Sequence, residues 1–336
     1  MPAAANRQWR LASRPEGMPP PETWELVEEE APSPGDGEVL VQVLLLSLDP
    51  AMRAWLDDVP SYIPPVGIGD VMRAIGVGRV VESRHSGVAE GAFVTGLFGV
   101  QEYAVLPGDG VTEIDAAAAP LATWLNVLGM PGMTAYFGLL EIGKPEPGQT
   151  VLVSGAAGAV GATVGQIAKV KGCRAVGIAG GPEKCGMLVD EFGFDAAIDY
   201  KNDDLRAALK EKCPDRVDVY FDNVGGEVLD AALGRLARGA RIAICGAVSQ
   251  YNEGSMRGPS NYMALLVRRA RMEGFVVFDY ASRYGEAARE LGGWMAAGKL
   301  KSVEDVVDGI ETFPATLLKL FRGENRGKLV LKVADA

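Results

Sequence analysis

The second half of the chain alternates between short apolar runs and longer segments in which apolar residues recur at helical spacing. Short runs rich in valine, isoleucine and alanine predict buried strands, and apolar residues three or four positions apart predict helices. Regular alternation of the two is typical of a parallel sheet with helices on both faces. The predicted strands are residues 150–153, 174–179, 196–200, 217–221, 241–245 and 272–278, and the predicted helices are residues 162–170, 203–212 and 228–238.

The first part of the chain has a different pattern, in which short β-rich runs are separated by turns rich in proline and glycine. This pattern is typical of a compact module of several short strands. The runs are residues 38–46, 76–81, 93–96 and 101–105.

The pattern changes near residues 125–140, where helical character begins, and again after about residue 298. Residues 303–321 predict loop and helix, and residues 328–333 predict a final strand that can rejoin the first module. We therefore expect an α/β protein with an inserted domain. A doubly wound sheet of residues 127–298 would interrupt a β-rich domain made of residues 1–126 and 299–336.

A glycine-rich turn connects the first strand of the inserted domain to its first helix. Gly155, Gly158 and Gly161 follow the strand at intervals of three, and Ala157 replaces the middle glycine of the usual G-x-G-x-x-G pattern. Such a turn lets a phosphate approach the backbone, and the following helix presents free N–H groups to it. The turn predicts a Rossmann domain whose dinucleotide would meet the three glycines, Ala159 and Val160. The alternative is that the small residues serve only close packing of helix on strand.

Composition excludes several classes of partner. The 336 residues carry a net charge of -11, which disfavours binding to nucleic acid. No apolar run approaches the roughly 18 residues that a membrane span needs. The N-terminal residues lack the apolar stretch of a signal peptide, so we expect a cytoplasmic protein.

Metal chemistry is not expected either. The four cysteines (Cys173, Cys185, Cys213 and Cys245) form no C-x-x-C pair, and the single histidine, His85, lies in a polar loop. A catalytic zinc ion normally takes three protein ligands. We interpret the cysteines as packing residues and expect no metal site.

Several short motifs, in a fixed order along the chain, carry a family resemblance. They are Leu48-Asp49-Pro50-Ala51-Met52-Arg53, Leu128–Tyr136, Ala156–Gly161, Asp222–Gly226, Gly246–Asn252 and Gly323–Val330. With these motifs the chain resembles the zinc-independent medium-chain dehydrogenase/reductase superfamily, and within it the reductases of alkenals, enones and oxo-prostaglandin-type substrates. The resemblance implies a GroES-like β-rich domain and a homodimer, for which the apolar strand at residues 272–278 would supply a sheet edge.

The second predicted strand of the Rossmann domain ends without a carboxylate, in Ala179-Gly180-Gly181-Pro182. NAD-binding domains usually place an acid there for the ribose 2′-hydroxyl, whereas a nearby lysine can neutralise a 2′-phosphate. The resemblance implies that Lys184 and Tyr200 bind that phosphate, so we expect NADPH. The alternative is that Lys184 is a solvated helix residue and Tyr200 an aromatic residue at the edge of the core.

The resemblance also implies contacts between the cofactor and residues scattered along the chain. For Asn325 the alternative is a helix-capping role. The remaining implied cofactor contacts are Met133, Thr134, Asn223, Cys245 and Phe278.

The chemistry follows from what the chain lacks. None of its tyrosines has a lysine four residues later, which excludes the Tyr-x-x-x-Lys mechanism of carbonyl reduction. Reduction of an α,β-unsaturated carbonyl needs only a hydride at the β-carbon, a hydrogen-bond donor at the developing enolate oxygen and a proton source. Tyr251 is the predicted donor, matching the acid proposed in the family, and a tyrosine packed at a domain edge is the alternative.

An unsaturated aldehyde or ketone is therefore the expected substrate. The predicted pocket residues are Ala51, Met52, Tyr62 and Tyr262, although each is also compatible with an ordinary core position. Related sequences often carry tyrosine where this chain has Ala51, so alanine would either enlarge the pocket or remove a polar contact from it. Two other functions stay open, a zinc-free NADPH quinone oxidoreductase and an NADPH-binding protein without catalysis.

Overall fold

The computed structural model describes residues 5–336, which form two compact units. Unit 1 consists of the chain up to Leu125 together with Glu304–Ala336, and unit 2 is Asn126–Val303. The chain thus leaves the β-rich unit, builds the α/β unit and returns, which confirms the predicted insertion of a doubly wound sheet into a β-rich domain.

Unit 2 is built on a six-stranded, wholly parallel sheet with the order β10-β9-β8-β11-β12-β13. The strand order reverses between β8 and β11, and parallel sheets bind ligands at the carboxyl ends of the strands beside such a reversal. The strands are β8 (Thr150–Ser154), β9 (Arg174–Ala179), β10 (Ala196–Asp199), β11 (Val217–Asp222), β12 (Leu236–Ile244) and β13 (Arg271–Gly274).

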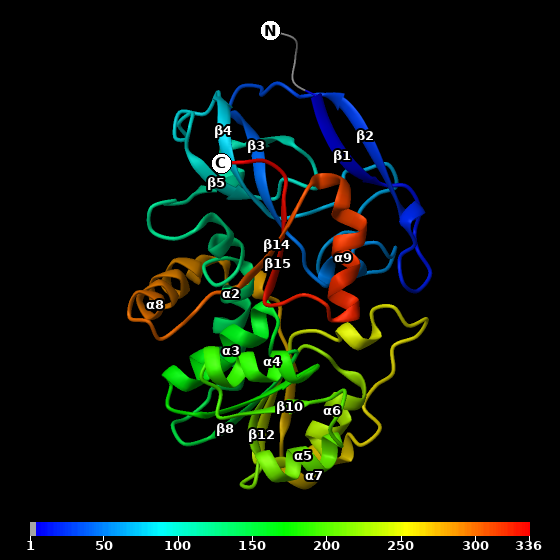
Figure 1. Cartoon of the computed structure of the whole chain (residues 1–336), viewed down its shortest axis with the longest axis vertical. Coiled ribbons are helices and arrows are strands. Elements are labelled where there is room, and N and C mark those ends of the chain that lie inside the picture. Colours follow the sequence, from blue (N-terminus) through cyan, green and yellow to red (C-terminus); the bar gives the residue numbers. More distant parts are fainter. Residues whose placement is uncertain (1–4) are drawn as a thin grey trace. The chain divides into compact units, whose positions relative to one another are not determined.

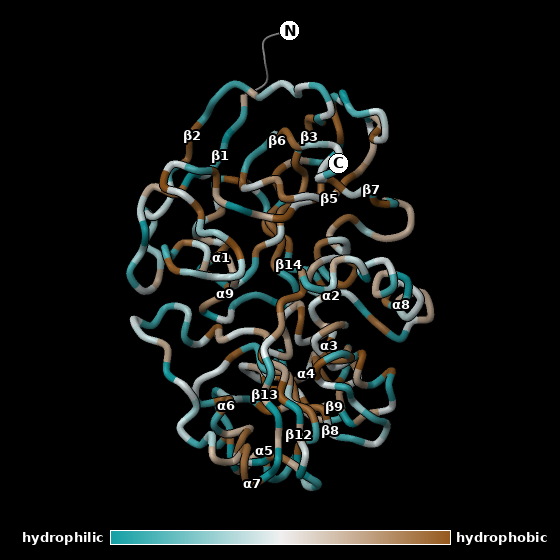
Figure 2. The backbone as a smooth tube through the Cα atoms, turned by 180° about the vertical axis from the view of Figure 1, so that it is seen from behind, coloured by the Kyte–Doolittle hydropathy of each residue, from teal (hydrophilic) through white to brown (hydrophobic). Residues whose placement is uncertain are grey.

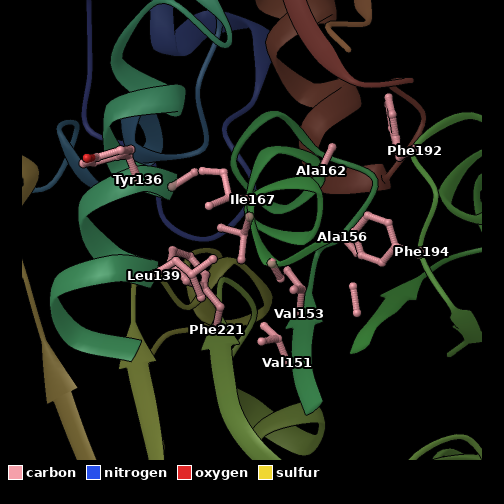
Figure 3. Packing of buried hydrophobic residues seen from close by; sticks show 14 of the residues in the cluster. Tyr136, Leu139, Val151, Val153, Ala156, Ala162, Ile167, Phe192, Phe194 and Phe221 are labelled. Carbon is pink, nitrogen blue, oxygen red and sulfur yellow. The ribbon is translucent and has the colours of Figure 1, made fainter. Parts of the chain in front are cut away.

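Helices cover both faces of this sheet because alternate strand residues point to opposite sides. Val151 and Val153 of β8 pack with α2 and α3 (Figures 1 and 3), whereas Leu152 packs toward α5, α6 and α7 on the other face. Figure 2 shows the tube brown around β8 and β9, as strands covered on both faces require. The helices are α2 (Met130–Phe137), α3 (Ala159–Val170), α4 (Pro182–Gly186), α5 (Leu205–Lys212), α6 (Gly226–Leu233), α7 (Met263–Arg268) and α8 (Tyr284–Ala296).

Unit 1 contains a seven-stranded sheet and a separate two-stranded hairpin. The C-terminal strand β15 (Lys328–Lys332) pairs antiparallel with β3 (Glu38–Ser47), so the end of the chain completes the sheet begun near its start. The other sheet strands are β4 (Gly76–Ser83), β5 (Phe93–Gly96), β6 (Tyr103–Pro107), β7 (Val111–Glu113) and β14 (Glu304–Asp308); the hairpin is β1 (Ala5–Leu11) and β2 (Trp24–Glu30), and the helices are α1 (Ala51–Ala54) and α9 (Phe313–Arg322).

Three predicted elements were wrong in extent or type. The predicted helix of residues 228–238 ends at Leu233, and β12 already begins at Leu236. The predicted strand of residues 272–278 ends at Gly274, and Phe278 lies in the 3₁₀ helix Val277–Arg283. Residues 304–308, expected as loop or helix, form β14 because they pair with β15.

The sequence patterns also gave no indication of the hairpin β1–β2. Its strands are mostly polar or charged and lack a regular apolar alternation, and the pairing runs from Ala5–Glu30 to Leu11–Trp24. Within residues 5–336, no helix is long and apolar enough to cross a membrane.

Candidate functional site

The glycine turn lies at the carboxyl end of β8, beside the point where the strand order reverses. Gly155 adopts a φ of 58°, a left-handed conformation that glycine tolerates. At Gly161 an added Cβ would stand 2.4 Å from the carbonyl oxygen of Gly155, so only glycine lets α3 pack this closely on the turn. Gly158 starts α3 without a side-chain cap, and Gly158, Ala159 and Val160 are only partly buried. This accessible helix start, with its uncapped N–H groups, fits a phosphate.

Asn223 closes the other side of the reversal point. Its Nδ2 donates to the carbonyl oxygen of Ser154 at 2.7 Å, and its Cβ lies 3.4 Å from the position that a Cβ on Gly155 would take. The predicted cofactor residue therefore lies next to the glycine turn, and its amide links the ends of β8 and β11.

A buried carboxylate fixes this arrangement. Oδ1 of Asp222, which is 1% exposed, accepts hydrogen bonds from the hydroxyls of Ser154 (2.9 Å) and Tyr220 (2.7 Å). It also accepts the N–H groups of Val224 and Gly225, each at 3.0 Å. Burial and the nearby carboxylate raise the pKa of Tyr220 well above its ordinary value. Four donors on one oxygen hold the loop that carries Asn223 in a single conformation.

Tyr251 belongs to a segment that runs alongside this loop. The N–H groups of Cys245 and Gly246 donate to the carbonyl oxygen of Asp222 at 2.9 and 3.1 Å, and that of Val248 donates to Asn223. The Tyr251 hydroxyl oxygen accepts the N–H of Ala247 at 3.3 Å. Asn223, Cys245 and Tyr251 thus come together at the carboxyl ends of β11 and β12.

Lys184 and Tyr200 come from neighbouring connections at the ends of β9 and β10. Tyr200 is 48% exposed, and its ring covers Gly180, where an added Cβ would stand 2.9 Å from Cε1 of the tyrosine. Cε of Lys201 lies at the same distance from the Cβ position of Gly180. The sequence pattern gave no indication that Lys201 is part of this site. Lys184 is the third residue of α4, four positions after Gly180. The structure thus places the Tyr200 ring and the Lys201 side chain beside Gly180, in the turn that leads into the helix of Lys184.

The predicted contacts Met133 and Thr134 lie on α2. Met133 is 5% exposed and belongs to the unit 2 core, while the Thr134 hydroxyl donates to the carbonyl oxygen of Met130 at 2.8 Å. Phe278 is 41% exposed in its 3₁₀ helix. Tyr262, 60% exposed, directly precedes α7, where the neighbouring Asn261 donates to the carbonyl oxygen of Asp230 in α6.

The remaining predicted residues belong to unit 1. Ala51 and Met52 begin α1, with Met52 fully buried, and Tyr62 is 56% exposed in the following loop. Asn325 is 8% exposed and its Nδ2 donates to the carbonyl oxygen of Gly327 at 2.8 Å, so its side chain shapes the loop before β15.

An ion pair between a buried lysine and a partly exposed aspartate joins these two segments of unit 1. Nζ of Lys328, which is 1% exposed, donates to Oδ1 of Asp49 at 2.6 Å and to the carbonyl oxygen of Leu48 at 2.8 Å. The contact anchors the turn before Ala51 to the strand after Asn325. Sequence reasoning missed it, although both residues belong to motifs that carried the resemblance.

The four cysteines lie in or against the cores of unit 2. Cys173 and Cys213 are buried, and burial raises the pKa of Cys185 and Cys213 to about 11 and that of Cys245 to about 12. These thiols are therefore protonated at neutral pH. Among residues 5–336, no group of three His, Cys, Asp or Glu side chains is arranged to hold a metal ion.

Two family models match the chain. Residues 7–114 match a model described as the N-terminal domain of oxidoreductase, and residues 159–292 match one described as zinc-binding dehydrogenase.

Curated relatives match over most of the chain. It is 46% identical to the NADPH-dependent curcumin reductase of Escherichia coli over 98% of this chain and 97% of that protein. It is 44% identical to the NADP(+)-dependent 2-alkenal reductase of Nicotiana tabacum over 89% of this chain and 88% of that protein.

Solved structures share the fold. CurA from Vibrio vulnificus in complex with NADPH has a TM-score of 0.93 and 43% identity, covering 98% of this chain and all of that one. The Escherichia coli quinone oxidoreductase, also solved with NADPH, has a TM-score of 0.79 over 98% of this chain at 21% identity, a likeness that concerns the fold alone.

Proposed function

The chain belongs to the zinc-independent medium-chain reductases that use NADPH to reduce the carbon–carbon double bonds of alkenals and enones, and from this we propose how its own residues carry the reaction. The observation that carries the proposal is the uncapped glycine turn at the end of β8 with Asn223 beside it, which fits the diphosphate of a dinucleotide.

The proposed cofactor contacts divide by the part of NADPH that they would meet. Gly155, Gly158, Ala159, Val160 and Gly161 would hold the diphosphate, and Lys184 and Tyr200 would hold the 2′-phosphate. The remaining proposed contacts are Met133, Thr134, Asn223, Cys245, Phe278 and Asn325.

When bound, NADPH supplies the hydride that reduces the β-carbon of the substrate. The protein must then stabilise the negative charge that develops on the carbonyl oxygen and provide a proton. We assign both tasks to the Tyr251 hydroxyl, which would hydrogen-bond the developing enolate oxygen and supply the proton directly or through water, and which accepts the Ala247 N–H at 3.3 Å. An oxygen that accepts one hydrogen bond is polarised toward donating its own proton, so this contact favours Tyr251 as donor.

The proposed substrates are α,β-unsaturated aldehydes and ketones with an apolar body. Ala51, Met52, Tyr62 and Tyr262 would line their binding site. Alanine at residue 51 leaves space that a larger side chain would fill, which favours bulky enones. The curcumin reductase among the relatives, whose name gives a large conjugated diketone as substrate, supports this choice.

The deciding experiment follows the loss of NADPH absorbance with a medium-chain enone, a 2-alkenal and a benzoquinone in parallel, and identifies the products. A saturated ketone and aldehyde are the expected products. Turnover of the quinone alone would instead make the chain a quinone oxidoreductase. NADPH binding without turnover of any of the three would indicate a binding protein.

We also propose that the chain forms a homodimer and resides in the cytoplasm. The edge strand β13 pairs only with β12 within its sheet, and the adjacent α7 exposes 68% of Leu266 and 60% of Val267. Uncovered sheet edges and apolar patches favour association. The four free cysteines support a reducing compartment.

A further inference from the structure

The carboxylate of Asp199 bonds to two turns that carry the proposed 2′-phosphate residues. Asp199 is the last residue of β10. Its Oδ1 accepts the N–H of Gly181, which lies in the connection that follows the neighbouring strand β9, at 2.7 Å. The same oxygen accepts the N–H of Lys201 at 3.1 Å. Oδ2 accepts Nδ2 of Asn202 at 2.6 Å. One side chain therefore connects the turn before Lys184 to the turn that contains Tyr200.

The contact to Gly181 controls where α4 begins. Gly181 is the residue before this short helix and has a φ of 92°, and no side chain of its own caps the helix. Its N–H is directed to Asp199, so the carboxylate fixes the strained residue from which Pro182, Glu183 and Lys184 follow. Without this acceptor, Gly181 could adopt many other backbone conformations, because glycine has no Cβ to restrict it.

The second turn is held by backbone groups of Asp199 in addition to its carboxylate, which accepts the Lys201 N–H and Nδ2 of Asn202. The N–H groups of Asn202 and Asp203 donate to the carbonyl oxygen of Asp199 at 3.1 and 2.8 Å, and the Asp199 N–H donates to Oδ2 of Asp203 at 3.0 Å. Tyr200, between these bonds, donates its N–H to Ala179 at 3.1 Å and lays its ring over Gly180. The ring position thus depends on the turn that Asp199 organises.

The charge of Asp199 has the wrong sign for direct contact with a phosphate. Desolvation disfavours its ionised form, but the hydrogen bonds from Gly181, Asn202 and Lys201 outweigh this and lower its pKa. These donors occupy both carboxylate oxygens, so the side chain is directed at the backbone rather than at a ligand. Its contribution to binding must come from geometry.

We propose that Asp199 is a positioning residue for cofactor selectivity, holding Lys184 and Tyr200 where they meet the 2′-phosphate that distinguishes NADPH from NADH. This inference rests on the proposed role of Lys184 and Tyr200. It places the acid on the strand next to the one whose tip carries the ribose-binding acid in NAD-specific domains, where it supports NADPH instead.

The test measures binding without catalysis. Dissociation constants of 2′,5′-ADP and 5′-AMP, which differ only in the 2′-phosphate, are determined by titration calorimetry for the wild-type chain and for Asp199→Ala, Asp199→Asn and Asp203→Ala. Asp199→Ala should weaken 2′,5′-ADP about tenfold, the loss expected for about one well-made hydrogen bond to a charged group, and leave 5′-AMP within about threefold.

The two other variants separate geometry from charge. Asp199→Asn keeps an acceptor oxygen for Gly181 and should retain 2′,5′-ADP binding within about threefold. Asp203→Ala removes the carboxylate that accepts the Asp199 N–H but leaves the contact between Asp199 and Gly181, so it should weaken 2′,5′-ADP less than Asp199→Ala does. Thermal unfolding confirms that each variant is folded. If the alanine variant unfolds, Asp199→Leu, which keeps the approximate size of the side chain but has no acceptor oxygen, takes its place with the same expected tenfold loss of 2′,5′-ADP binding.

Three results would overturn the inference. They are unchanged or tighter 2′,5′-ADP binding by Asp199→Ala, an equal loss for both nucleotides, and a loss in Asp199→Asn as large as in Asp199→Ala. A wild-type chain that binds both nucleotides equally would instead refute the proposed role of Lys184 and Tyr200, on which the inference depends. The enone assay is independent of all these outcomes.

Discussion

Lys184 and Tyr200, 16 positions apart in sequence, belong to the connections that follow two neighbouring strands. Lys184 follows β9 and Tyr200 follows β10, and these strands are parallel neighbours in which Ala179 pairs with Asp199. Because parallel strands end at the same edge of a sheet, the residues that follow them are brought together. Their residue types suit an adenosine phosphate, with a cation for the charge and a ring beside it.

Substituting Lys184 with alanine should raise the KM for NADPH about tenfold and leave the KM for NADH nearly unchanged. The reason is that a lysine contributes charge-assisted hydrogen bonds to a phosphate that NADH lacks. Steady-state kinetics with both cofactors measure the effect. Lys210→Ala, in the exposed part of α5, is the control; equal changes with NADPH and NADH would contradict the assignment.

Replacing Tyr251 with phenylalanine should lower kcat for an enone at least about a hundredfold, the contribution expected of a positioned general acid. The dissociation constant of NADPH should not change, because only the hydroxyl is removed. Turnover and cofactor titration together separate the two effects. Tyr103→Phe, in β6, removes a hydroxyl from a strand of unit 1 as a control. Undiminished turnover by the Tyr251 variant would remove this residue from the mechanism.

At the scale of elements, the connection from β8 to α3 combines two roles for glycine. At Gly161 an added Cβ would meet backbone atoms of Gly155 and Ala156 at 2.4 and 2.8 Å, and backbone cannot move aside as a flexible side chain does. At Gly158 the nearest atom to an added Cβ is 3.4 Å away, which is ordinary contact. Gly161 is therefore needed for packing, whereas Gly158 faces the space where a phosphate would lie.

Gly161→Ala should destabilise the chain by about 1–3 kcal/mol, as overpacking does. Gly158→Ala, with an added methyl at a position of negative φ, should leave the melting temperature nearly unchanged and weaken NADPH binding. Thermal unfolding and cofactor titration of both variants test this separation. The separation of roles is wrong if Gly161→Ala has the same melting temperature as the wild type, or if Gly158→Ala binds NADPH as tightly as the wild type does.

On the scale of the whole molecule, the sheet of unit 2 ends in β13, beside the apolar surface of α7. A second copy of the chain could extend the sheet across β13 by pairing its own β13 there. Two features support the dimer. The open edge of β13 offers backbone hydrogen bonds to a second copy, and the exposed apolar residues of α7 would be buried against it.

Light scattering should therefore give twice the chain mass of 35.5 kDa. Val267→Glu should shift the population to the single-chain mass, because it places a charge in the apolar surface next to β13. Val306→Glu, at a similarly exposed valine in β14 of unit 1, should leave the mass unchanged. A single-chain mass for the wild type would refute the dimer.

Much of this architecture was determined by the sequence itself. The central strands β8 and β9 are buried on both faces, so they form continuous apolar runs that need no knowledge of their partners; β9 was predicted with its observed bounds. The glycine turn was equally readable, because positive φ and close approach leave few other residues possible at Gly155 and Gly161. The return of a strand pattern at the end of the chain predicted the insertion, and the family motifs predicted the NADPH-dependent chemistry.

Tertiary structure alone decided what depends on pairing between distant segments. β14 has charged residues at three of its five positions, and it is a strand because β15 supplies its hydrogen bonds. Asp222 and Asp199 look like ordinary strand-end acids in sequence, yet the fold directs them at backbone N–H groups of neighbouring connections. Local pattern determines which backbone conformation a segment prefers. Only the assembled chain determines which donors a carboxylate meets, because those donors come from residues that become neighbours on folding.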